Sequence, residues 1–155
     1  MGSAVARVSR TDPLKRILLA GIISGLVVLG IGGRLLMRGL AYTTPEAPRF
    51  ALAGTLQVIG AGLAWGAITA PLLARIPGLV STRPRVAGVI HGVIVLAVAV
   101  LVFLVATGGG GRIVAPASFV VLSGVLFPML FIVHGLVVVL LAYGRRRDHP
   151  RSDHE

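Results

Sequence analysis

Four long apolar blocks constrain this chain more than any other feature of its sequence. Each extends for about 20 residues, the length that an α-helix needs to cross the roughly 30 Å hydrocarbon core of a bilayer. Only 13% of the residues are charged, against about 25% in an average soluble domain. The blocks do not alternate in polarity, as the strands of a membrane barrel do. We therefore expect an all-α protein that folds as a transmembrane four-helix bundle.

Short segments that contain proline, glycine and arginine divide the four expected spans. The spans are predicted over residues 14–40, 50–75, 86–106 and 117–143. Residues 1–13 form a basic segment before the first span, and residues 144–155 form a charged tail after the last. The segment IPGLVSTRPR, residues 76–85 with Pro77 and Pro84, is expected to be a turn, because proline interrupts helices.

The distribution of arginine and lysine predicts the orientation of the chain, because cytoplasmic loops carry an excess of both. With the N-terminus inside, eleven basic residues fall on the cytoplasmic side and four fall outside. The four outer residues are Arg34, Arg38, Arg49 and Arg112. We therefore expect a multi-pass protein of the inner (plasma) membrane with both termini in the cytoplasm.

The net charge of +10 indicates which partners the loops and tails would meet. Anionic lipid headgroups attract basic residues beside membrane spans, so the lipid bilayer is the expected partner. A nucleic-acid site would show a basic face interleaved with aromatic side chains, and aromatic residues make up only 5% of the chain. We expect no nucleic-acid binding.

Paired glycines in the first three spans predict close helix packing. The Gly-x-x-x-Gly pattern occurs at Gly21 and Gly25, at Gly62 and Gly66, and at Gly88 and Gly92. Small residues at this spacing let membrane helices approach closely. The three copies favour a compact bundle, or a homo-oligomer formed through one of these seams.

Each predicted span also has a polar or aromatic residue directly before a glycine. These pairs are Ser24-Gly25, Trp65-Gly66, His91-Gly92 and His134-Gly135. Their distances from the cytoplasmic ends of the helices are similar, so we expect them to form one layer. The flanking sequences IISGLVVL and VIHGVIVL also match. Either the second pair of helices repeats the first, as in many transporters, or chains of similar composition simply align.

His91 and His134 are the candidate ligands inside the spans, where an ionisable residue is a functional hypothesis by default. They could be the axial ligands of a b-type haem, or could share a metal ion or a proton. The other interpretation is structural, with neutral histidines that bond to a backbone carbonyl, Ser24 or Thr69. The low aromatic content favours the structural interpretation, so no cofactor is expected.

Arg34 and Arg38 lie four residues apart on one face of the first helix, near its outer end. One interpretation is an interfacial anchor, whose long side chains reach the headgroups. The other is an anion-binding or gating site that includes Gln57 in the outer half of the second helix. In that case the protein would be a channel or transporter for a small solute or anion.

The acidic residues all lie outside the spans. They are Asp12, Glu46, Asp148, Asp153 and Glu155. Paired carboxylates for acid–base catalysis are therefore lacking within the membrane, and a chain without cysteine has no thiol nucleophile or thiolate metal site. We predict no catalytic residue, no metal site and no enzymatic activity. The expected role is a structural or accessory component of a membrane complex or homo-oligomer, with the channel and a haem-binding redox protein as alternatives.

Two stretches carry a resemblance to known families. The run GGRLLMRGLA and the later PRFALAGTLQVIGAGLAWGAI resemble small uncharacterised bacterial four-helix integral membrane proteins, which implies the fold and no activity. The Gly-Thr-Leu of the second run is also faintly similar to small four-helix fluoride channels. That family has an asparagine shortly after this motif, where this chain has Gln57, Val58 and Ile59.

Overall fold

A computed structural model describes residues 12–42, 51–75, 77–106 and 117–144, and over these residues the chain is all-α. The expected tail after the last span lies outside the described residues, except for Gly144, and so does the N-terminal segment before Asp12. Asp12 and Pro13 already belong to the first helix, because proline is well accommodated in a first helical turn.

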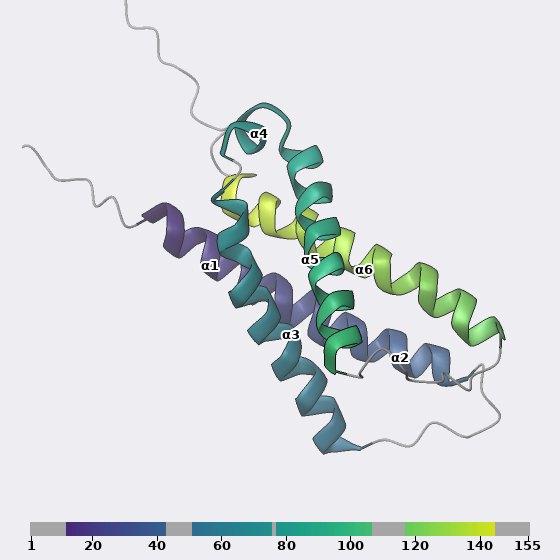
Figure 1. The fold of residues 1–155 in the computed structure, drawn as a ribbon. Coiled ribbons are helices and arrows are strands. Elements are labelled where there is room, and N and C mark those ends of the chain that lie inside the picture. The colour runs from purple at the N-terminus through teal and green to yellow at the C-terminus, as the bar shows by residue number, and fades with distance from the viewer. Residues whose placement is uncertain (1–11, 43–50, 76, 107–116, 145–155) are drawn as a thin grey trace, which may run out of the picture.

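Seven helical elements build the described part of the fold (Figure 1). They are α1 (Asp12–Ser24), η1 (Gly25–Gly32), α2 (Gly33–Ala41), α3 (Leu52–Leu73), α4 (Pro77–Thr82), α5 (Pro84–Ala106) and α6 (Ala117–Tyr143). The first three follow one another as one long helix. Four stretches are long and apolar enough to cross a membrane: Leu14–Ala41, Leu52–Leu73, Pro84–Val105 and Ala117–Tyr143. The prediction of an all-helical chain with four apolar helices is therefore confirmed.

The expected turn between the second and third spans is instead the short helix α4. Pro77 occupies its first position, where the missing N–H costs nothing because the first N–H groups of a helix have no partner within it. The helix ends before Arg83, the residue that precedes Pro84 and is biased away from helical backbone angles. The prediction took Pro77 as part of a turn and missed that it starts a helix.

The middle of the first long helix is a π-helix, η1, where a plain α-helix was expected. Its end shows the wider winding, because the N–H of Gly33 reaches the carbonyl of Val28, five residues earlier. In this winding, residues five apart share one face. Gly25 and Gly30 therefore both contact Gly62: a Cβ atom at Gly62 would lie 2.7 Å from the Gly25 oxygen and 2.7 Å from the Gly30 Cα. The π-helix thus brings Gly30, in addition to Gly21 and Gly25, into the contact between the first long helix and α3.

The six glycines of the predicted packing pattern all lie where two helices meet. In the first antiparallel pair, a Cβ atom at Gly66 of α3 would lie 2.8 Å from the Cα of Gly25. In the second, a Cβ atom at Gly92 of α5 would lie 2.8 Å from the Cα of Ile132 in α6. No side chain fits at such distances, so only glycine allows these backbones to touch.

The two antiparallel pairs use equivalent contacts. Gly66 lies against Gly21 and Gly25 in the first pair, and Gly135 lies against Gly88 and Gly92 in the second. The distance from a Cβ built on the central glycine to the facing Cα is 2.8 Å at Gly66 and 2.9 Å at Gly135. The contacts therefore match in the way that a repeat of the first pair by the second requires.

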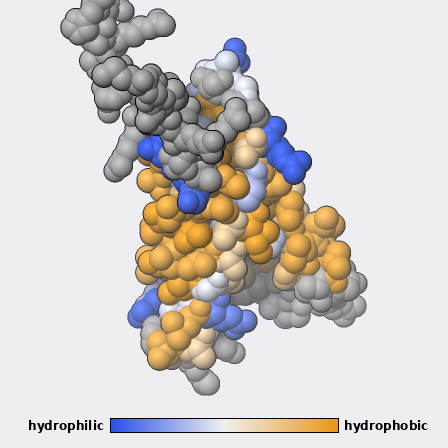
Figure 2. Space-filling model, turned by 90° about the vertical axis from the view of Figure 1, so that its left-hand side faces the viewer, coloured by the Kyte–Doolittle hydropathy of each residue, from blue (hydrophilic) through white to orange (hydrophobic). Residues whose placement is uncertain are grey.

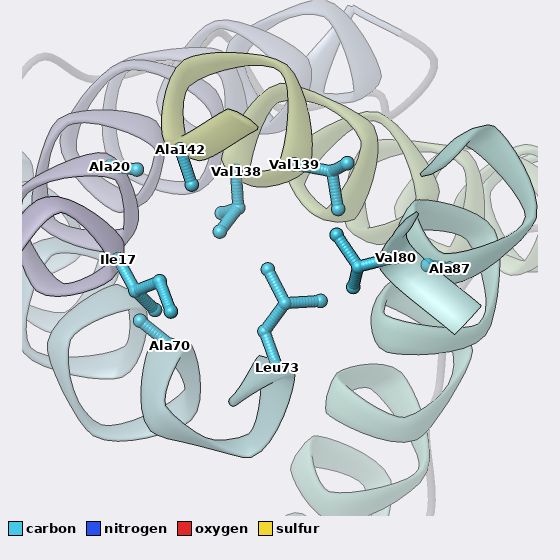
Figure 3. Close-up of a cluster of buried hydrophobic side chains, with 9 residues drawn as sticks. All are labelled: Ile17, Ala20, Ala70, Leu73, Val80, Ala87, Val138, Val139 and Ala142. Carbon is cyan, nitrogen blue, oxygen red and sulfur yellow. The ribbon is translucent and has the colours of Figure 1, made fainter. Parts of the chain in front are cut away.

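A cluster of buried apolar side chains joins the pairs at one end of the molecule (Figure 3). We call this the basic end, because it carries Lys15, Arg16, Arg75, Arg83 and Arg85. The cluster takes residues from α1, α3, α4, α5 and α6: Ile17, Ala20, Ala70, Leu73, Val80, Ala87, Val138, Val139 and Ala142. Most are small, which lets five elements converge in a narrow space.

The helices separate toward the opposite end. We call residues 52–61 of α3, 96–105 of α5 and 117–133 of α6 the far halves of these helices, and none of their side chains is buried. On the face shown in Figure 2, a broad apolar band lies between hydrophilic residues at the two ends. Tight packing in the described part of the chain is thus concentrated at the basic end and along the long first helix.

The glycine contacts predict how α3 responds to added methyl groups. Gly66→Ala places a Cβ atom against the backbone of Gly21 and Gly25, whereas nothing in the described residues lies within 4 Å of a Cβ at Gly60. We expect Gly66→Ala to destabilise the protein by about 1–3 kcal/mol, the usual cost of overpacking, and Gly60→Ala to leave its stability nearly unchanged. Thermal unfolding of both variants in one detergent, followed by circular dichroism, measures the difference. Equal unfolding midpoints would contradict this account of the seam.

Candidate functional site

Three polar side chains from three helices meet near the basic end of the molecule. Ser24 closes α1, His91 lies in α5 and His134 lies in α6, and their exposed fractions are 0%, 1% and 0%. Two of them are the histidines that the sequence marks as candidate ligands. Buried polar groups in proteins are almost always hydrogen-bonded, so their partners are informative.

Ser24 makes two contacts with His134. Its Oγ lies 2.8 Å from the ring Nδ1 and 3.1 Å from the backbone oxygen of the same residue. A serine hydroxyl has one proton to donate. Both bonds form together only if the hydroxyl donates to the carbonyl and accepts from a protonated Nδ1. In a neutral imidazole this arrangement leaves Nε2 of His134 without a proton and with a free lone pair.

The two histidine rings face each other across the α5–α6 seam. Their centroids lie 6.1 Å apart and their planes are tilted by 35°. Nε2 of His91 and Nε2 of His134 are both buried, and neither has a hydrogen-bond partner among the described residues. An unsatisfied buried polar group costs about 1–3 kcal/mol, so two of them in adjacent rings mark this point as unusual.

Glycine backbones hold the three side chains in place. Each of the three precedes a glycine at a helix–helix contact: Gly25 meets Gly66, and Gly92 meets Gly135. Trp65, on α3, also precedes such a glycine, and its buried Nε1 has no partner in the described residues. Contacts thus run from α3 to α1 through glycines, from α1 to α6 through Ser24, and from α6 to α5 through the rings. The four predicted residue–glycine pairs lie in one connected layer.

The second group of predicted site residues is placed differently. Arg34 is half-buried, and its Nε donates a 3.0 Å hydrogen bond to Oγ1 of Thr55, which itself donates to the carbonyl of Ala51. This bond ties the first long helix to the start of α3. Arg38 and Gln57 are exposed. Among the described residues, Arg34 thus bonds to α3, and no hydrogen bond joins it to Arg38 or Gln57.

Two features of the site were not found in the sequence. Gly30 lies in the same helix contact as Gly25, beside Ser24. It follows Gly25 by five residues, a spacing that places two residues on one face of a π-helix but not of an α-helix. The pairing of Ser24 with His134, out of several polar candidates, has no signal in the sequence at all. Thr69, the other candidate, donates to the carbonyl of Trp65 in its own helix at 2.8 Å.

The bond between Ser24 and His134 predicts the effect of removing one hydroxyl. Ser24→Ala leaves a buried Nδ1–H without a partner, so we expect a loss of about 1–3 kcal/mol in unfolding free energy. Ser123→Ala is the matched control, because that hydroxyl bonds only to the carbonyl of Val120 in its own helix, at 3.1 Å. Denaturant unfolding in mixed micelles compares the two variants. A Ser24→Ala protein as stable as the control would refute the proposed role of the bond.

No family model, characterised protein or solved structure matches this chain.

Proposed function

We propose that this chain is a four-span membrane protein that acts by assembly, as a non-enzymatic component of a homo-oligomer or of a larger membrane complex. One observation carries the proposal. The helices touch backbone to backbone at the glycine seams, whereas no side chain is buried in the far halves of α3, α5 and α6. These segments thus keep exposed surface that the described residues do not cover.

The uncovered surface has the chemistry of a membrane-helix interface. Nothing among the described residues lies within 4 Å of a Cβ atom built at Gly60 in α3 or at Gly124 in α6. Gln57, one turn before Gly60, is exposed in the same far half. Small residues and hydrogen-bonding amides are the groups through which membrane helices associate. Lipid tails fill grooves at such glycines less well than a second helix does.

The contacts support assembly over the alternatives raised by the sequence. The side chain of Arg34 bonds to Thr55 of α3. Such a fixed contact suits a residue that joins two helices better than one that moves to gate a channel. A haem between His91 and His134 would need a slot for a flat macrocycle between α5 and α6. There a Cβ at Gly88 would lie 2.9 Å from the Cα of Leu136, and one at Gly135 would lie 2.9 Å from the Cα of Gly92. Backbones this close argue against a porphyrin at the seam.

The native chain has no cysteine, so a single added thiol reports contacts of one position only. We expect Leu101→Cys in α5 or Val121→Cys in α6 to form disulfide-linked species in native membranes under mild oxidation, because both side chains are exposed in the far halves. Leu19→Cys in α1 is the matched control, since it is exposed near the basic end. A band at twice the mass indicates self-assembly, and an adduct of another mass indicates a partner complex. Monomer alone at both far-half positions would overturn the proposal.

We further propose that the basic end faces the cytoplasm, in agreement with the excess of basic residues there. Two exposed residues test this orientation: Thr82, the last residue of the basic-end helix α4, and Tyr42, which follows α2. A membrane-impermeant maleimide should label Tyr42→Cys in intact spheroplasts and should label Thr82→Cys only after lysis. Labelling in the reverse order would show the opposite orientation, and labelling of both in intact cells would contradict a four-span insertion.

A further inference from the structure

We propose that His91 and His134 bind one monovalent copper ion through their Nε2 atoms. The inference is independent of the proposed assembly and concerns the seam between α5 and α6 within one chain. It starts from two buried ring nitrogens that have no hydrogen-bond partner among the described residues. Each belongs to a side chain that is at most 1% exposed, and each comes from a different helix.

The protonation of His134 suits a ligand. The two bonds of Ser24 require Nδ1 of this ring to carry the proton, so its Nε2 presents a lone pair. Metal-binding histidines almost always donate the opposite ring N–H to an oxygen, which fixes the tautomer and the ring orientation. Ser24 provides that oxygen here. This outer contact separates His134 from a histidine that merely fills space.

The separation of the rings fits one small ion. Bonds between metals and imidazole nitrogens are about 2 Å long, so two rings on one ion have centres separated by two such bonds and two ring radii. The observed 6.1 Å between the ring centroids is of that size, and the proposal requires that both Nε2 atoms point toward the ion. A single ion needs only the space between two nitrogens, so it is compatible with the backbone contacts that argue against a haem.

The donor set selects the ion. No third histidine, cysteine, aspartate or glutamate joins the pair within the described residues, and the spans contain no acidic residue to neutralise added charge. Zinc takes four ligands in structural sites, and the cost of burying an uncompensated charge rises steeply with its magnitude. Monovalent copper accepts two nitrogen donors in a line and brings half the charge of a divalent ion. Imidazole is a suitable ligand for copper.

The site lies where a small ion could be held firmly. His91 follows Pro84, the start of α5, by seven residues or about 10 Å of helix. Gly92 and Gly135, whose backbones are in contact, directly follow the two histidines in their helices. The ligands are therefore positioned before binding, which lowers the entropic cost of capture.

The test measures copper in the intact protein. Full-length protein in nanodiscs is reduced with ascorbate, titrated with Cu(I) and challenged with the chromophoric chelator bicinchoninate. We expect one copper per chain, and X-ray absorption should show two nitrogen neighbours at about 2 Å. His91→Leu should lose the bound copper to the chelator. The double variant His149→Ala/His154→Ala, which removes the tail histidines of the sequence, should keep it.

A second variant separates loss of the site from loss of the fold. Ser24→Ala keeps both ligands and removes the hydroxyl that holds the His134 ring, so it should bind copper about 10–100-fold more weakly. Circular dichroism verifies that each variant remains helical. Copper retained by His91→Leu, copper lost with the tail histidines, or equal affinity in Ser24→Ala would each overturn the proposal. A wild-type protein that binds no copper would overturn it as well.

Discussion

Contact between glycine backbones is the interaction on which the rest of the structure depends. Lipid tails are as apolar as the side chains of these helices, so burial of apolar area does not by itself bring membrane helices together. Where Gly66 lies against Gly25, and Gly135 against Gly92, the peptide groups of two helices approach as closely as atoms allow. Dispersion between closely packed atoms, small for each pair, sums over these contacts.

The glycine contacts also create the polar site. Because each of Ser24, His91 and His134 precedes a glycine at a seam, its side chain lies beside a backbone contact and is withdrawn from the surface. The π-helix η1 extends this arrangement by bringing Gly30 to the face that Gly25 already occupies. Such π segments occur frequently at functional sites. The residues that bring these helices into contact thus also form the candidate ligand site.

The two ends of the molecule differ in a way that separates two kinds of function. Toward the basic end, small buried side chains and glycine seams produce a rigid layer that can hold two imidazoles at a set distance. In the far halves of α3, α5 and α6 no side chain is buried, and these helices present exposed small groups such as Gly60 and Gly124. We infer binding at the first and association at the second, and the two proposals can fail separately.

The amino-acid sequence by itself determined that the chain has four long apolar helices, because a run of that length can satisfy its backbone groups in lipid only as a helix. It also marked the six seam glycines and both histidines. Only the tertiary structure decided which glycines meet, that Pro77 starts a helix, and that Ser24 rather than Thr69 bonds to His134. The physical reason is that helices such as α5 are apolar on all sides. No amphipathic stripe shows which face turns inward, so the choice depends on how closely two particular backbones can approach.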